Sequence, residues 1–515
     1  MLQLSRQFEA RAVLGAVARR LNRVPEALFD KCPRIYFFAA VAIALTGLLF
    51  LLSFPAVTAY LFAALGGRLL EGQLSLLSWE VASGALLAAG GVWITLYLLE
   101  LQPELPQGRK LGSSEGSELR ALVSQLRDRY RAPPIASFTI TDHWAVDVRR
   151  VPVGGIPLAF RNHLEIGLPV LLSMSPGYFE GLLAGKIGQL SGLHDKWSGW
   201  LSTQCEVWSG YGSACSKDGR LPGYVLAAFT AGFVPLLAWF SRCAVRRHRL
   251  EFDRYAHDVL SAQDLSDMLA VSVVLARFLE ERYWPMIYKA AEHVAEPAVL
   301  PYANLKQILK LKLDEQDVQR WLRQAMSVPD DGISDTPVLR ARLEEIGQDR
   351  IAWPGIASET ACSRYLGASA EAIVTDQDRA WVEGNRAAWK KCFDQSQDDR
   401  NRLRALSMKL KRGPLRGRDA MTYAALTKKF CDRDKAVDAY KRILEINPED
   451  ARIQFGAGKY LVSVGDAHGV KALENAMGLD KQYVDPACRL ISEFTAYHRK
   501  QVRETQATNG WAKAG

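Results

Sequence analysis

The sequence predicts a mainly α-helical fold with a small β-sheet (α+β), held in a membrane by a helical hairpin and ending in α-helical repeats. Three observations predict it. Two long uncharged runs lie near the N-terminus, short extended and helical patterns alternate in the middle, and repeat-like helical spacing marks the C-terminus. A chain of 515 residues is long enough for two or three domains, each with a sizeable core.

Changes in composition along the chain divide it into five parts. They are a basic amphipathic segment at 1–34, a transmembrane helical hairpin at 35–100, a central domain at 101–347, a polar and basic linker region at 348–419, and helical repeats at 420–515. The eight cysteines include no pair with the C-x-x-C spacing of a zinc or redox site. Scattered thiols of this kind indicate a reducing compartment.

The net charge of +9 suits a protein that lies against anionic membrane lipids, and it also suits one that touches nucleic acid. The main basic stretch, residues 402–418, is interpreted as a solvated helix face and linker rather than a binding patch. We therefore expect membrane lipids as partners and no nucleic acid.

The N-terminal hairpin is predicted from two runs without charge, 35–65 and 81–99. About 20 apolar residues cross the roughly 30 Å hydrocarbon layer of a bilayer. Seven Lys and Arg residues precede the first run, whereas the loop between the runs carries only Arg68. The positive-inside rule therefore places the N-terminus and the chain after Glu100 in the cytoplasm.

Apolar residues also repeat at helical spacing before the first run. They are Leu14, Val17, Leu21, Val24 and Leu28. The arginines beside them favour a helix on the membrane surface. A helix packed on the protein itself fits the spacing equally well.

The central domain begins with a helical pattern at 119–130 and two extended segments at 135–140 and 144–151. An apolar run at 164–172 follows. Ser175 and Pro176 are then typical of the start of a helix, which we expect to include residues 185–189.

Three short blocks surround residues 185–189. They read Ile-Gly-Leu-Pro-Val-Leu-Leu at 166–172, Ser-Pro-Gly-Tyr-Phe at 175–179, and Leu-Ser-Gly at 190–192. This order resembles the membrane-anchored zinc peptidases of the HtpX heat-shock protease and CAAX prenyl protease family. In that family the helix carries His-Glu-x-x-His. The resemblance spans about 35–347 and implies a gluzincin-like metallopeptidase domain, a bacterial-type inner membrane and a role in protein quality control.

Two later blocks extend the resemblance. Aligning Asp253 and the residues after it with the family's Glu-x-x-x-Asp helix puts the glutamate ligand position at Arg249. Thr336 and Pro337, with Arg342, match the other, which usually reads His-Pro followed by an arginine.

The aligned positions have lost the residues that hold and use zinc. Gly185 has no side chain, Gln189 offers an amide, and Lys186 puts a cation where a general base is required. Arg249 is a cation in place of an anionic ligand. We therefore expect no catalytic residue, no metal and no cofactor. We also expect Lys186 and Arg249 to lie close together among carboxylates. Asp253 lies one helical turn from Arg249 and could pair with it.

A different metal site remains an alternative. His194, His248, Glu251 and His257 are the residues that would supply it, with Asp253, and zinc would then be the cofactor. A solvated or ion-paired helix in a very basic stretch explains the same residues without a metal.

A third uncharged run occupies residues 221–241. If it crossed the membrane alone, Gly185 and Arg249 would lie on opposite sides. We therefore interpret it as a buried or membrane-dipping helix.

The C-terminal region resembles tetratricopeptide repeats. Ala424, Ala436, Tyr440 and Pro448 match small and aromatic positions of one repeat, and a poorer copy follows. Residues 486–502 are expected to form a capping helix. Such arrays bind peptides or partner proteins, although a helical bundle without a ligand fits too.

These features favour a membrane-anchored pseudopeptidase that holds a polypeptide client without cutting it. The client would lie along the edge strand that contains Trp144, Val146 and Val148. One alternative is an active membrane metalloendopeptidase with non-standard ligands. Another is a membrane-tethered scaffold in which the helical repeats alone act.

Overall fold

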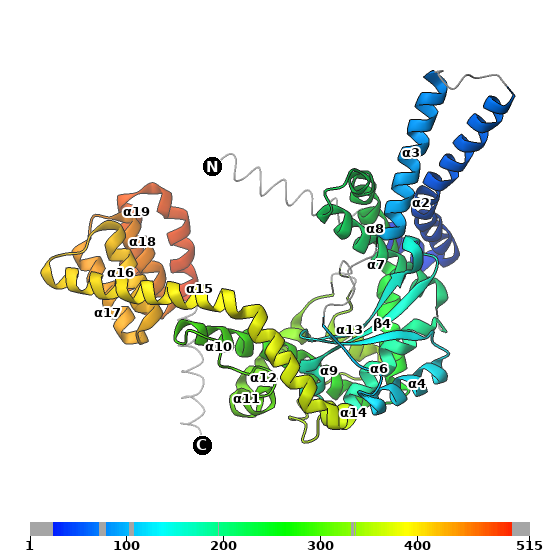
Figure 1. The fold of residues 1–515 in the computed structure, drawn as a ribbon. Helices are drawn as coiled ribbons and strands as arrows, with labels where there is room; N and C mark the ends of the chain where they lie inside the picture. Colours follow the sequence, from blue (N-terminus) through cyan, green and yellow to red (C-terminus); the bar gives the residue numbers. More distant parts are fainter. Residues whose placement is uncertain are drawn as a thin grey trace. The chain divides into compact units, whose positions relative to one another are not determined.

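The computed structural model describes residues 24–71, 79–101, 108–193, 195–330, 334 and 336–496, and its fold is mainly helical with one small sheet (Figure 1). The predicted α+β class is confirmed at this level. The chain forms two compact units. One comprises Met1–Pro285 and Val299–Glu383, and the other comprises Met286–Ala298 and Gly384–Gly515.

Helices α2 (Pro33–Leu70) and α3 (Trp79–Glu100) form the predicted hairpin (Figure 1). The two helices approach closely at Gly91 of α3, where a Cβ atom would lie 2.0 Å from the Thr58 hydroxyl of α2. Three helical stretches, Pro33–Arg68, Val81–Glu100 and Leu221–His257, are long and apolar enough to cross a membrane. Large apolar side chains on α2 and α3 remain exposed, among them Phe38, Leu49, Tyr60, Phe62, Leu86 and Leu87. Membrane association follows from this length and composition.

The N-terminal segment is described only from residue 24. Residues 24–31 are helical, Leu28 packs against the core of the first unit, and Glu26 pairs with Arg242 at 2.8 Å. Leu14, Val17 and Leu21 lie outside the described residues. For residues 24–31, packing on the protein is therefore the observed arrangement.

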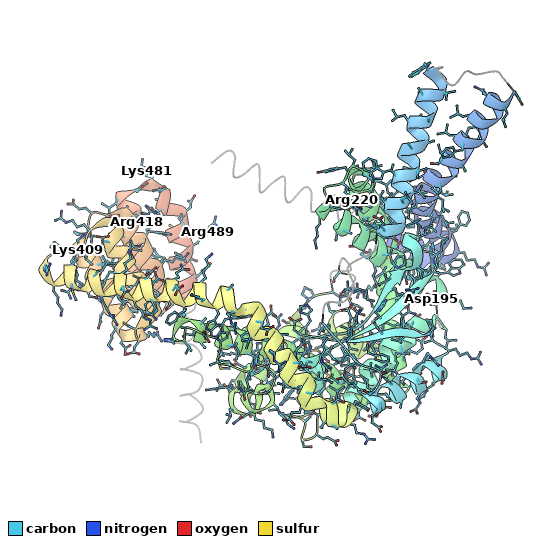
Figure 2. All side chains as sticks on the ribbon, in the orientation of Figure 1. Asp195, Arg220, Lys409, Arg418, Lys481 and Arg489 are labelled. Atoms are coloured by element: carbon cyan, nitrogen blue, oxygen red, sulfur yellow. The ribbon has the colours of Figure 1, made fainter. Side chains whose placement is uncertain are left out.

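Helices α7 (Lys196–Lys217) and α8 (Leu221–His257) run antiparallel beside α2 and share its core. Arg220 marks the short turn that joins them (Figure 2). At the start of α7, Asp195 lies 3.3 Å from Arg247 of α8. Helix α7 leads the chain away from Gly185, and α8 runs back antiparallel to it as far as Arg249 and beyond. A membrane-crossing α8 therefore need not separate Gly185 from Arg249. Our sequence argument against a span at 221–241 is therefore wrong in its premise.

The sheet contains β1 (Arg109–Lys110), β2 (Ile135–Thr141), β3 (Val146–Pro152) and β4 (Phe160–Gly167) in the order β1-β2-β4-β3. Strand β4 is parallel to β2 and antiparallel to β3. Strand β3 is therefore an edge strand, as the sequence predicts.

Helices α4 (Ser117–Tyr130) and α6 (Pro176–Ser191) also lie where their patterns predict. The apolar run at 164–172 divides between β4 and the short helix α5 (Leu168–Ser173), because Pro169 lacks an N–H and suits the first turn of a helix. The rest of the first unit is built from α9 (Ala262–Phe278), α10 (Trp284–Lys289, which continues into the second unit), α11 (Leu305–Lys312), α12 (Glu315–Ser327), α13 (Leu339–Glu345) and α14 (Ala361–Leu366).

Residues 348–419, expected to form a linker region, contain α14 and the 43-residue helix α15 (Ala370–Arg412). The two compact units divide inside α15, between Glu383 and Gly384, and not near residue 419. This region is helical and not an extended linker because a polar sequence with many charges still forms a helix when a few apolar residues recur on one face. In α15, Trp381 and Trp389 are such buried residues.

In the second unit, four helices pack as consecutive neighbours: α16 (Gly417–Phe430), α17 (Arg433–Ile446), α18 (Ala451–Ser463) and α19 (His468–Leu479). Gly458 and Gly469 allow α18 and α19 to touch, since a Cβ on Gly469 would lie 2.6 Å from the Val462 nitrogen. Residues 484–496 are helical and overlap the segment 486–502 that is expected to cap the array, whose residues 497–502 lie outside the described part of the chain. Lys409, Arg418, Lys481 and Arg489 all belong to this unit (Figure 2).

Candidate functional site

A cleft of about 450 Å³ lies in the first unit, beside the edge strand β3. Its walls come from the segment that leads into β3, from α6, α7 and α8, and from residues 336–342. Residues 186–189, the part of α8 around Arg249 and residues 336–342 therefore meet at one cavity. Their members on its wall include Lys186, Gln189, Arg249, Thr336, Pro337 and Arg342.

Helix α6 presents residues 185–189, the positions aligned with a zinc motif, to α8. The helix begins at Ser175, whose hydroxyl accepts a hydrogen bond from the Tyr178 N–H, with Pro176 at its first position. A Cβ on Gly185 would lie 2.4 Å from the Phe252 ring. The ring therefore fills the space into which the first histidine of a zinc motif would project.

The other two motif positions make hydrogen bonds to the protein. The Gln189 amide donates to the backbone carbonyl of His248 at 2.8 Å. The Lys186 ammonium donates to Oδ1 of Asp147 at 3.1 Å, and its nitrogen lies 6.0 Å from the centre of the Phe252 ring. Both side chains thus stabilise the cleft wall without any metal.

Asp253 pairs with Arg342 and not with Arg249, the nearby partner that the sequence suggested. Two parallel hydrogen bonds of 2.9 and 2.7 Å join the Arg342 guanidinium to the Asp253 carboxylate, which is fully buried. A planar guanidinium fork satisfies both carboxylate oxygens at once. Arg249 instead donates to the Thr336 hydroxyl at 2.5 Å. Lys186 and Arg249 do line the same cleft, and Asp147 is a carboxylate that also lines it.

The alternative metal ligands do not form a zinc site in the described part of the chain. His248 Nδ1 lies 3.3 Å from Glu251, and both side chains are buried between helices. His257 is exposed near the end of α8, and His194 lies outside the described residues. Among the residues that the structure describes, no group of three or more His, Cys, Asp and Glu side chains could hold a metal ion. With two cations and the Phe252 ring at the aligned positions, these residues do not fit catalytic zinc.

Three charged residues of the cleft, Asp147, Arg150 and Glu206, were not predicted from the sequence. Glu206 is open to water in the cavity but has protein on most other sides. This burial raises the pKa of Glu206, Asp147 raises it further, and Arg150 opposes the rise. Arg150 donates to the Thr203 hydroxyl, and burial lowers the pKa of its guanidinium. Glu206 is the only charged residue between Lys196 and Lys217, a signal that the sequence did contain.

We expect the stability of the protein to depend on pH through Glu206. A raised pKa in the folded state means that the native chain holds this proton more tightly than the unfolded chain, so stability falls as pH rises through that range. Glu206→Gln should therefore raise the melting temperature at pH 7, and the gain should vanish below about pH 4. Thermal unfolding in detergent measures this, with Glu280→Gln on the surface as the control. A gain that grows as the pH falls would contradict the assignment.

Comparison with family models, with curated proteins and with solved structures finds no match to this chain. The peptidase resemblance therefore remains a prediction from the sequence blocks.

Proposed function

We propose that the chain is a membrane-anchored, peptidase-like protein that binds an extended polypeptide in its cleft and does not hydrolyse it by zinc chemistry. The observation that carries this proposal is an open edge strand beside a cleft whose would-be ligand positions are Gly185, Gln189 and Arg249, with Lys186 at the would-be general-base position. The retained framework supports a binding role, and the altered centre argues against the family's reaction.

An extended chain suits this cleft for a geometric reason. One edge of β3 pairs with β4, which leaves the other edge for a strand supplied by a ligand. The client-binding residues expected from the sequence, Trp144, Val146 and Val148, all line the cavity. Val146 and Val148 are largely buried, whereas Trp144 is half-buried and able to contact a bound side chain.

The proposed place of action is the cytoplasmic face of a bacterial-type inner membrane. Three candidate membrane helices support the anchor, and the excess of Lys and Arg before the first of them supports the orientation. The helical pairs of the second unit would recruit a partner protein, as tetratricopeptide-like arrays do.

Photocrosslinking tests this proposal. Benzoylphenylalanine replaces Trp144 in the full-length protein in detergent, and carboxymethylated casein serves as an unfolded polypeptide. We expect adducts with casein and no cleavage of it. The matched control replaces Trp197, an aromatic residue in the same unit that is 56% exposed and outside the cleft.

Two results would change the conclusion. Cleavage of casein that a chelator stops would favour an active metalloendopeptidase. Equal crosslinking from positions 144 and 197 would remove the cleft from the binding site, and would favour the scaffold alternative if deletion of residues 420–515 also abolished casein binding.

A further inference from the structure

The carboxylate of Asp147 accepts hydrogen bonds from two donors at the edge of β3. Its Oδ1 accepts a hydrogen bond from the Val148 backbone N–H at 2.9 Å and another from the Lys186 ammonium at 3.1 Å. The Asp147 side chain is 65% exposed. Asp147 Oδ1 therefore occupies the position in which an oxygen atom of a bound ligand would accept hydrogen bonds from the same two donors.

The Val148 N–H points to the free edge of the sheet. Backbone hydrogen bonds join Gly167 to Ala145 and Val153 to Ala159, which fixes the phase of the β3–β4 ladder. Odd-numbered residues of β3 therefore bond to β4, and even-numbered residues present their N–H and C=O groups to the cleft side. A ligand strand would need the Val148 amide, which Asp147 now covers.

The charges around this position favour a negatively charged ligand group. Lys186 is joined on the cleft wall by Arg249 and Arg150, and each of these two guanidinium groups has a neutral hydroxyl as its hydrogen-bond partner. Within the described residues, neither has a carboxylate at ion-pair distance. Glu206 is a further carboxylate on the cleft wall, and burial and the neighbouring Asp147 raise its pKa.

We infer that the cleft recognises the free C-terminal carboxylate of an extended polypeptide, which displaces Asp147 from Val148 and Lys186. This inference rests on the proposed function and names the ligand group at the same site. A carboxylate there gains charge-assisted hydrogen bonds that the carbonyl of an internal peptide cannot make. The displaced Asp147 side chain is exposed enough to turn into solvent.

Peptide capture tests the inference. Random octapeptides are tethered by their N-termini and made in three forms: free acids, C-terminal amides, and amides with one internal phosphoserine. The full-length protein in detergent is the soluble partner, and its apparent Kd is measured. We expect free acids to bind about ten-fold more tightly than amides, the scale of one charge-assisted contact.

Variants of the two key residues sharpen the result. Asp147→Ala should tighten the binding of free acids, because it removes the internal competitor. Lys186→Gln should abolish the difference between acids and amides, and Lys186→Arg should keep it. The control is Asp142→Ala, since Asp142 is exposed and does not line the cleft.

The outcomes separate this inference from the proposed function. Equal capture of acids and amides would overturn carboxylate recognition and leave polypeptide binding in place. Tighter capture of the phosphoserine amides would overturn it in favour of an internal phosphoryl group. No capture of any form, even by Asp147→Ala, would overturn both.

Discussion

Arg342→Met is expected to lower the free energy of unfolding by about 3–5 kcal/mol, the typical cost of leaving a buried charge without its partner. Asp253 is fully buried, and Arg342 provides both of the hydrogen bonds that compensate its carboxylate. Removal of the guanidinium leaves that carboxylate uncompensated between α8 and α13. Chemical denaturation of the detergent-solubilised protein, followed by tryptophan fluorescence, measures the loss.

The same pair of helices offers a matched control. Arg254 on α8 pairs with Glu345 on α13, but the Arg254 side chain is 55% exposed. Arg254→Met should therefore cost only about 0–1 kcal/mol. Adding Asp253→Asn to Arg342→Met should recover part of the loss, since the buried charge is then gone. If Arg342→Met and Arg254→Met lowered the free energy of unfolding equally, the burial of Asp253 would not determine how much its pair with Arg342 contributes to stability.

Gly185→His, the first step in restoring a zinc motif, is expected to destabilise the first unit by about 2–3 kcal/mol through overpacking. A Cβ at this position would lie 2.4 Å from the Phe252 ring, closer than real Cβ contacts come. The ring is wedged between α6 and α8 and contacts the Arg342 guanidinium, so it cannot move freely. The melting temperature in detergent measures the effect.

Gly177→His is the control for this prediction. Gly177 lies on the same helix, and a Cβ there would meet no heavy atom within 4 Å. Combining Gly185→His with Phe252→Ala should restore part of the stability that Gly185→His removes. If Gly185→His and Gly177→His change the melting temperature equally, Phe252 does not close the metal position.

The sequence predicted the local elements of the site well because their signals are local. Ser175 and Pro176 mark the start of α6, and the extended pattern at 144–151 corresponds to the edge strand β3. The order of the sequence blocks also placed Lys186, Arg249 and Arg342 around one cleft. Membrane helices were visible because a bilayer demands long apolar runs.

What the sequence could not supply depends on three-dimensional competition. Arg249 lies one helical turn from Asp253, yet Asp253 pairs with Arg342, which is far away in the sequence. The guanidinium of Arg342 reaches both carboxylate oxygens. Nothing in the sequence shows that the Phe252 ring enters the space beside Gly185. The position of Asp147 over the Val148 amide depends on the ladder phase of β3, which a pattern of apolar residues does not determine.

The zinc content of the purified full-length protein, measured by elemental mass spectrometry after exposure to zinc and desalting, tests the central claim most directly. The claim is that the cleft binds a polypeptide and holds no catalytic zinc. We predict far less than one zinc per chain, with no change in His248→Ala or His257→Ala. One zinc per chain that either substitution removes would contradict the claim.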